Sequence, residues 1–258
     1  MNLRIVARVA CALFLLSPAP LLAQDMLQGV DLSQPAYSKS ELSRADVEAA
    51  LAAHKSDFSG KSLNGLDLSG LDLSGANFRA ARLNKVRLPG AKLDKAILDQ
   101  AWLIEADLTG ASLKGAHAFA AQMQRMRADG ADFSGARVAG DLTGASLRGA
   151  TFNDANLSAD MKNQSMGLMR AVLKSAIVEG AHFRKANLMS ADLRFAHAAG
   201  ADFSGANLMN ADASGADLTG AIMTGANTKD LDLDSAQIDG VPESALQHAQ
   251  HLDRARRR

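Results

Sequence analysis

The segments Ala76-Asn77-Phe78-Arg79-Ala80, Ala106-Asp107-Leu108-Thr109-Gly110 and Ala216-Asp217-Leu218-Thr219-Gly220 follow one five-residue pattern. Each has a large apolar residue at its centre and a small residue, usually Ala, two places earlier. The pattern runs from Phe58 to Ile238 in 36 units, and Leu or Phe holds the centre of 26 of them. A period of five fits neither the helical period of 3.6 residues nor the strand period of two. The pattern therefore predicts a coil with flat sides, in which the large and the small residue of each unit face inward.

Glycine often stands two places after the centre, as at Gly60, Gly70, Gly110 and Gly220. Glycine there predicts a corner at which φ is positive. With this feature the chain resembles the pentapeptide-repeat family, over about 180 residues. The resemblance implies an all-β fold, a right-handed quadrilateral parallel β-helix with four repeats per coil. It also implies about nine coils, with layers about 4.8 Å apart.

Residues 1–23 have the features of a secretory signal peptide. Arg4 and Arg8 precede a short apolar run, and Ala23 offers a small residue for cleavage. The run is shorter than the roughly 20 residues that span a bilayer, so an uncleaved anchor is the less favoured alternative. The sequence therefore predicts a bacterial protein that is periplasmic or secreted.

The two ends of the repeat are expected to be covered, because a stack of repeats otherwise exposes an apolar end. Residues 24–55 are interpreted as a lead-in and a capping helix whose capping box is Ser38-Lys39-Ser40-Glu41. The repeat itself is assigned to residues 56–240. Residues 241–258 are interpreted as a second helix, which has Pro242 in its first turn, and a solvated basic tail. In the family such terminal helices can build dimers, so a homodimer through this helix is implied.

The five-residue register breaks at two places. The step from Val138 to Leu142 is one residue short, and residues 158–167 contain an extra residue. Shortly before the first break, Ala118, Met123 and Ala128 take the central positions that large apolar residues hold in most units. Weak packing or a kink is expected there, either as a binding feature or as tolerated variation.

If four units make a coil, residues twenty apart lie above one another, and the outward positions can be read as columns. Asp67, Arg87, Asp107 and Arg127 would then alternate in charge, whereas the acidic residues Asp192, Asp212 and Asp232 would stack as like charges. The acidic column is a candidate partner contact, and its alternative is a merely solvated face.

An outward position that is polar in most units holds an apolar residue in five of them, Ile97, Trp102, Val172, Ile177 and Ile222. Trp102 is the only tryptophan, and it is expected at or near the surface. An outward aromatic residue with an apolar neighbour suggests a contact patch. Scattered surface apolar residues are common, and this is the alternative.

The sequence carries no pattern that points to an enzyme. The glycines follow the repeat rather than a phosphate-binding loop. His248 and His251 would supply only two metal ligands, which is too few for a structural site. The only cysteine, Cys11, falls in the predicted signal peptide. We therefore expect no catalytic residue, no cofactor, no metal and no small-molecule substrate.

The leading hypothesis is a non-catalytic, exported, rod-shaped module that binds or scaffolds an unknown protein or envelope component. The alternative is a DNA mimic that modulates a type II topoisomerase, as some pentapeptide-repeat relatives do. The signal peptide and the balance of 28 basic against 28 acidic residues disfavour that alternative. Direct nucleic-acid binding is also disfavoured, since the basic stretch from Arg79 to Lys95 is short.

Overall fold

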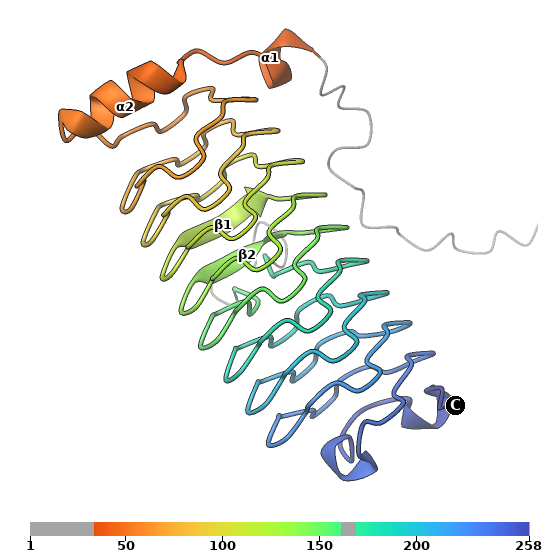
Figure 1. Ribbon diagram of the computed structural model, residues 1–258. Helices are drawn as coiled ribbons and strands as arrows, with labels where there is room; N and C mark the ends of the chain where they lie inside the picture. Colours follow the sequence, from red (N-terminus) through yellow and green to blue (C-terminus); the bar gives the residue numbers. More distant parts are fainter. Residues whose placement is uncertain (1–33, 161–168, 258) are drawn as a thin grey trace, which may run out of the picture. The chain divides into compact units, whose positions relative to one another are not determined.

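The computed structural model describes residues 34–160 and 169–257. The chain divides into two compact units, Met1–Leu32 and Ser33–Arg258. The predicted signal peptide lies outside the described residues. The second unit is a stack of coils, with α1 (Pro35–Ser38) and α2 (Arg44–Ala52) on its N-terminal side (Figure 1).

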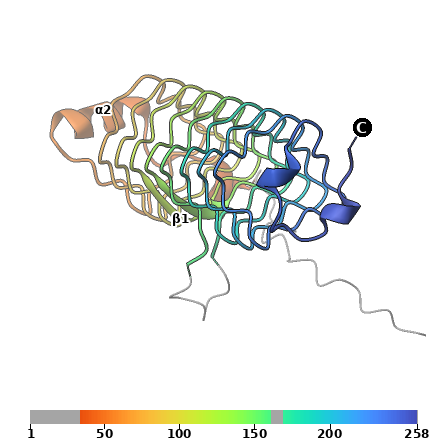
Figure 2. The same cartoon turned by 90° about the horizontal axis from the view of Figure 1, so that it is seen from below.

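Parallel bridges join successive coils at a spacing of twenty residues over most of the chain. Asp57 bridges Asn77, and Asn77 bridges Ile97. The Phe58 N–H donates to the Asn77 carbonyl at 2.7 Å, and the Asn77 N–H donates to the Ser56 carbonyl at 2.8 Å. This two-bond unit recurs from coil to coil, and the coils lie one behind another in Figure 2. Four five-residue units per coil is thus confirmed in the described residues.

The bridged residues form four columns that run along the stack. The first column contains Asp57, Asn77, Ile97, His117, Arg137, Asn156, Asn187, Asn207 and Asn227. The second contains Ser62, Arg82, Trp102, Gln122, Asp141, Val172, Asp192, Asp212, Asp232 and Gln250. The third begins at Asp67 and ends at Arg256, and the fourth begins at Asp72 and ends at Ile222. These columns place side chains from successive coils next to one another along the stack.

The large and small residues of each unit fill one continuous core, as the pattern predicts. Four phenylalanines stack within it, Phe133, Phe152, Phe183 and Phe203, with neighbouring ring centroids 4.7, 4.9 and 5.0 Å apart and planes within 7°. Parallel rings at this separation follow from the spacing of neighbouring strands, which is about 4.8 Å.

The corners adopt the left-handed conformation whether or not glycine is present. Gly70 has φ of 70°, and Lys85 and Glu105 have φ of 56° and 58°. The prediction of positive φ at the glycine corners is confirmed. The repeat geometry imposes the same conformation on other residue types, although an L-residue pays roughly 1–2 kcal/mol for it.

Aspartates that precede a unit's centre stabilise its turn. In Asp67-Leu68-Ser69 the Asp67 carboxylate accepts the Ser69 backbone N–H at 3.0 Å and also the Ser69 hydroxyl. The hydroxyl and N–H of Ser69 lower the pKa of Asp67, because both bonds favour the charged form. Asp132 makes the same pair of bonds with Ser134. Aspartates at this position therefore stabilise the turns of the repeat and are not free surface charges.

The short step at Val138–Leu142 becomes a β-bulge. Strand β1 (His117–Gln122) pairs with β2 (Arg137–Asp141), and the register shifts between Phe119 and Gln122. The bridge spacing accordingly falls to nineteen at Gln122 and Asp141 and rises to thirty-one at Asp141 and Val172. Residues 161–168, which hold most of the second register break, lie outside the described residues.

The N-terminal cover is formed by α2, but the predicted capping box is wrong. The N-cap is Ser43, whose side chain accepts from the Asp46 N–H, while the Asp46 carboxylate accepts from the Ser43 N–H. The segment before it pairs with the first coil instead, since the Glu41 N–H donates to the Ser62 carbonyl at 2.8 Å. Val47 is the residue of α2 that is fully buried.

The predicted C-terminal helix is also wrong in form. The segment contains two single-turn 3-10 helices, η2 (Glu243–Ala245) and η3 (Leu252–Arg254), and it returns to the stack. Gln250 bridges Asp232, and Arg256 bridges Gln237. Pro242 lies outside η2 as its N-cap and cannot donate a backbone hydrogen bond. The tail was predicted to be solvated, and the side chains of Arg254, Arg256 and Arg257 are exposed. Its backbone is nevertheless ordered against the stack through the Arg256 bridge, and Arg254 is paired with Asp234 at 3.2 Å.

Candidate partner-binding surface

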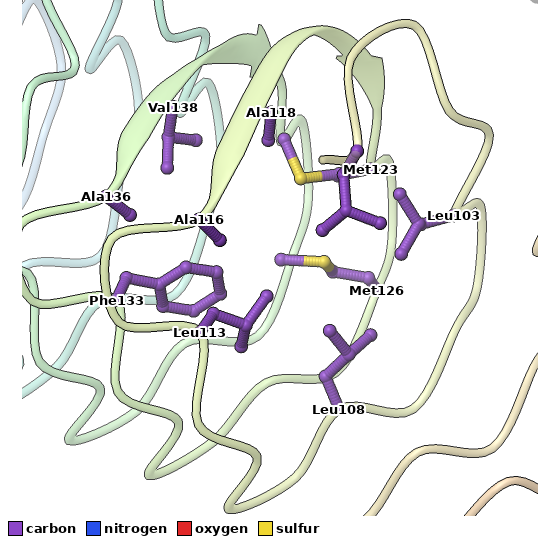
Figure 3. A pocket seen from close by; sticks show the side chains of 11 residues that line it. Leu103, Leu108, Leu113, Ala116, Ala118, Met123, Met126, Phe133, Ala136 and Val138 are labelled. Atoms are coloured by element: carbon purple, nitrogen blue, oxygen red, sulfur yellow. The ribbon is translucent and has the colours of Figure 1, made fainter. Parts of the chain in front are cut away.

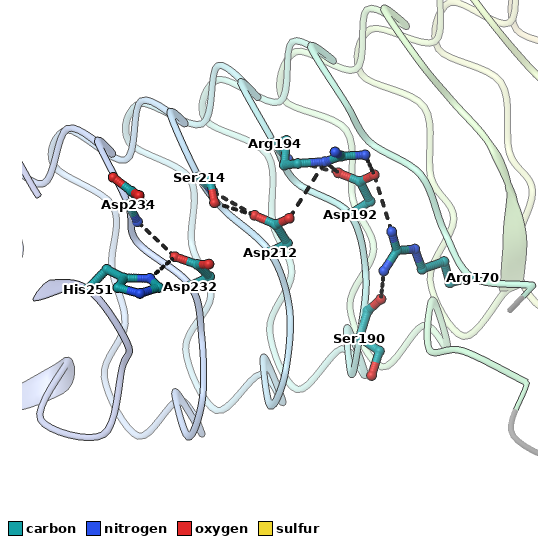
Figure 4. Close-up of polar contacts among 9 residues, drawn as sticks. All are labelled: Arg170, Ser190, Asp192, Arg194, Asp212, Ser214, Asp232, Asp234 and His251. Carbon is teal, nitrogen blue, oxygen red and sulfur yellow. Dashed lines mark hydrogen bonds and ion pairs between the residues drawn. The ribbon is translucent and has the colours of Figure 1, made fainter. Parts of the chain in front are cut away.

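The predicted acidic column exists, but its charges are largely compensated. Bridges join Asp192 to Asp212 and Asp212 to Asp232. Asp192 is only 2% exposed, and Arg194 binds it with two side-chain nitrogens, one at 2.8 Å (Figure 4). Arg170 approaches the same carboxylate at 3.4 Å. Two guanidinium groups therefore neutralise the residue that was interpreted as the start of a like-charge stack.

The pKa of Asp192 reports this balance. Burial raises it, but the hydrogen bonds from Arg194 and the charges of Arg194 and Arg170 together lower it below its usual value. The carboxylate is charged and is held by a bidentate contact of the strong kind. The pair of Asp192 and Arg194 could have been predicted from the spacing in Asp-Leu-Arg. In this repeat the residue two places after a bridged aspartate lies beside the aspartate, as Ser69 lies beside Asp67.

The other two acids of the column are also paired. Asp212 accepts from the Ser214 N–H at 3.0 Å and lies 3.6 Å from Arg194. Asp232 contacts His251 Nδ1 at 2.8 Å and accepts the Asp234 N–H (Figure 4). Burial raises the pKa of Asp232, whereas the contacts with His251 and the Asp234 N–H outweigh burial and lower it. The three acids are thus stacked as predicted, but each of them has a compensating partner, and the role of the column as a partner contact stays a prediction.

The alternating third column is aligned as predicted, and Arg87 lies 3.4 Å from Asp67. Both side chains are more than half exposed. Exposed pairs of this kind contribute only about 0.2–1 kcal/mol to stability.

Ile97 lies in a surface depression, whereas Trp102 does not line it. We define the Ile97 surface as two adjoining hollows of about 340 and 240 Å³ that share Asp99 and His117. The first is lined by Arg79, Lys95, Ile97, Asp99, Gly115 and His117, and the second by Asp99, His117, Phe119, Arg137 and Asp160. Trp102 is half-buried and stands in the neighbouring column, between Arg82 and Gln122.

Two ion pairs fix charged side chains that line the Ile97 surface. Arg79 lies 3.3 Å from Asp99, whose other oxygen accepts the Phe119 N–H at 3.0 Å. Arg137 lies 3.4 Å from Asp160 and places its guanidinium 5.2 Å from the centre of the Phe119 ring. A cation over an aromatic face is an attractive and well-oriented contact. The surface thus combines apolar side chains with positioned charges of both signs, which sequence reasoning missed except at Ile97.

A third hollow lies inside the core and has no polar lining. It measures about 10 Å³ and is surrounded by side chains such as Leu103, Ala118, Met123 and Met126 (Figure 3). Ala118 and Met123 stand at centres where the repeat usually has leucine, and Met126 stands where it usually has alanine. This confirms the prediction of weak packing around Ala118. Its volume is about that of one water molecule, and an apolar wall gives water no partner.

The described residues bring together no group of three or more His, Cys, Asp or Glu side chains that could hold a metal ion. Within the same residues, no helix has both the length and the hydrophobicity to cross a bilayer. The absence of a catalytic site, a cofactor and a metal stays a prediction.

The model of the pentapeptide-repeat family matches residues 62–100, 96–135, 140–159, 168–197 and 186–225, in eight copies. The chain therefore belongs to the pentapeptide-repeat family, whose proteins fold as right-handed β-helices. A search among curated proteins found no match.

Among solved structures, the chain is similar to full-length QnrB1, a plasmid-mediated fluoroquinolone resistance protein. The two share 18% identity over 76% of this chain and 93% of QnrB1, with a TM-score of 0.65. It is also similar to HetL, a pentapeptide repeat protein involved in heterocyst differentiation regulation from the cyanobacterium Nostoc sp. strain PCC 7120. That alignment has 27% identity over 77% and 98% of the two chains, with a TM-score of 0.28. The first likeness supports the fold, and the second is too low in TM-score to bear on the geometry.

Proposed function

We propose that this chain is a non-catalytic, exported protein-binding module of about nine coils, and that the Ile97 surface is its principal contact. The observation that carries the proposal is the mixture found there. Ile97 and Phe119 supply apolar area, and Arg137 supplies an oriented guanidinium. Aromatic residues and arginine are the side chains most enriched where protein interfaces concentrate their binding energy.

The charge of the surface favours a partner with acidic side chains. Arg79 and Arg137 are paired with Asp99 and Asp160, whereas no described residue forms an ion pair with Lys95. The Lys95 stem lies across Gly115, beside His117. An acidic group on the partner would complement Lys95, and an apolar side chain would cover Ile97.

Site-specific photo-crosslinking tests the proposal. A photoreactive amino acid at position 97 should capture a discrete partner in cells, and Arg137→Glu should abolish the capture. Position 177 is the matched control, because Ile177 is also half-buried but belongs to the third column. Equal capture from positions 97 and 177, or capture that survives Arg137→Glu, would refute the assignment of this surface.

Export is the second part of the proposal, and it has its own experiment. Fractionation of the bacterium with N-terminal sequencing should recover a chain that begins at Gln24 outside the cytoplasm. An intact Met1 in the cytoplasm would reject the signal peptide.

DNA mimicry stays the alternative prediction, and the paired acidic column does not favour it. A mimic must present rows of uncompensated negative charge, whereas Asp192, Asp202 and Asp232 are each bound by a cationic or hydrogen-bonding side chain. Excess protein in a topoisomerase supercoiling reaction is expected to leave the rate unchanged.

A further inference from the structure

The insertion at the second register break leaves the hydrogen bonds of the repeat intact. The coil that contains it spans thirty-one residues instead of twenty, so eleven residues, 160–170, are inserted. Just before them, the Ala159 N–H donates to the Met189 carbonyl at 3.1 Å. Just after them, the Ala171 N–H donates to the Leu157 carbonyl at 3.2 Å. Other units make the same two bonds at their corners, so the coil closes without help from the inserted residues.

Both ends of the insertion are nevertheless tied to the stack by charged side chains. Asp160, its first residue, lies 3.4 Å from Arg137 of the preceding coil. Arg170, its last residue, lies 3.4 Å from Asp192 of the following coil (Figure 4). The two ends are also joined to each other, because the Asp160 N–H donates to the Met169 carbonyl at 2.8 Å. Surface insertions are tolerated without such anchors, so these contacts suggest a role beyond tolerated variation.

The contact at the first end belongs to the Ile97 surface. Asp160 lines its second hollow together with Phe119 and Arg137. The Asp160 side chain is only 10% exposed, whereas that of Arg137 is 45% exposed. The Arg137 guanidinium therefore has a nearly buried carboxylate on one side and the Phe119 ring 5.2 Å away. A buried carboxylate needs a paired cation, so the place of Asp160 favours one position of the guanidinium.

We propose that Asp160 is a positioning residue of the Ile97 surface, which holds Arg137 beside the Phe119 ring in the orientation that binds the partner. This inference rests on the proposed function of that surface. A free arginine side chain loses conformational freedom when a partner orders it, and a side chain that is already held loses less. The second register break is then a binding feature.

The ion pair with Asp160 does not occupy the whole guanidinium. An arginine side chain has five N–H donors in a planar fork, and one carboxylate at one edge leaves donors at the other. Arg137 contacts Asp160 through Nη2. Its exposed part can therefore donate to an acidic or carbonyl oxygen of the partner while Asp160 stays in place.

The test of the positioning role uses the full chain and needs no partner. An aromatic ring shifts the NMR signals of a group beside it, so the Nε–H signal of Arg137 reports its contact with Phe119. In Asp160→Asn, which keeps the shape of the side chain and removes its charge, this signal should move toward the positions of the exposed arginines. Asp160→Glu keeps the charge and should move it less. Glu179→Gln is the matched control, because Glu179 pairs with Arg148 at 3.2 Å and lines neither hollow.

The effect on binding is measured with the photoreactive amino acid at position 97. Asp160→Asn should lower the yield of the captured partner about two- to tenfold, which corresponds to the cost of ordering one arginine side chain. Glu179→Gln should leave the yield unchanged. Both variants should melt at the temperature of the parent, since neither side chain closes a repeat hydrogen bond.

Three results would overturn the proposal. The first is an Arg137 signal that stays in place in Asp160→Asn. The second is an undiminished capture yield in the same variant. The third is an Asp160→Asn chain that does not fold, which would assign Asp160 to stability instead. Absence of capture from the parent has a different meaning: it would reject the proposed function of the Ile97 surface, whereas a shifted Arg137 signal would still support the positioning of Arg137 by Asp160.

Discussion

Gly140 is the position at which the structure makes its sharpest prediction about stability. Its φ is not positive, so the left-handed corner conformation is not the reason for glycine here. A Cβ at this residue would lie 2.5 Å from the Ala121 carbonyl oxygen and 3.1 Å from the Ala121 nitrogen. Ala121 lies in the bulged part of β1, where the shortened repeat brings the backbones of β1 and β2 close together. Relief requires a backbone movement, since ordinary contact begins at 3.4 Å.

We expect Gly140→Ala to lower the free energy of unfolding by about 2–3 kcal/mol, in the upper part of the range for overpacking. For a domain of this size each 1 kcal/mol lowers Tm by about 2–4 °C, so Tm should fall by about 4–12 °C. Circular dichroism melts at one fixed scan rate measure this change.

Gly149→Ala is the control. Its Cβ would meet nothing within 4 Å, although φ is +60°. Other corners hold alanine natively, Ala80 and Ala120, so the cost should be about 1 kcal/mol. A Tm for Gly140→Ala within 2 °C of the parent, or an equal loss for Gly149→Ala, would refute the reasoning about the bulge.

The remaining predictions concern the phenylalanine stack and the buried acid. Phe152→Ala, in the middle of the stacked rings, should cost about 3–5 kcal/mol in urea unfolding, whereas Phe195→Ala at the surface should stay within about 0.5 kcal/mol. Arg194→Gln should cost about 1–3 kcal/mol at pH 7, because it removes the strongest partner of Asp192. The pKa of Asp192 is lowered by folding, so its contribution to stability is present above its unfolded value near 3.8 and is lost as pH falls through the folded value. The stability difference between the parent and Asp192→Asn should therefore be constant from pH 7 to about pH 5 and shrink below pH 4, and a difference independent of pH would contradict this assignment.

The sequence was sufficient to predict the repeat because each unit repeats the same local choice. Leu68 and Phe78 are buried for the same reason as every other centre, so the period alone identifies the core. It was also sufficient to align the columns, since a spacing of twenty residues follows from four units per coil. The weak packing near Ala118 could be predicted as well, because the loss of a large centre is visible in the pattern.

The ends could not be predicted in the same way. Ser38–Glu41 has the spacing of a capping box, but so does Ser43–Asp46, and local propensity does not choose between them. The choice depends on which segment pairs with the first coil, and Glu41 does so through its backbone N–H. The helical interpretation of residues 242–252 failed for a related reason. Backbone bridges from Gln250 and Arg256 to earlier coils compete with a short helix, and they satisfy groups that a helix would leave unpaired.

The candidate site shows the same division between local and tertiary information. Ile97 stood out because an apolar residue at an outward position breaks the pattern. Phe119 and Arg137, which line the adjoining hollow, did not stand out, because their position depends on the coil spacing and the bulge. The sequence by itself thus determined the coil, its core and the order of its columns, since these depend on a period. The tertiary structure decided which charges are compensated, because this depends on residues from different coils that meet only after the chain has folded.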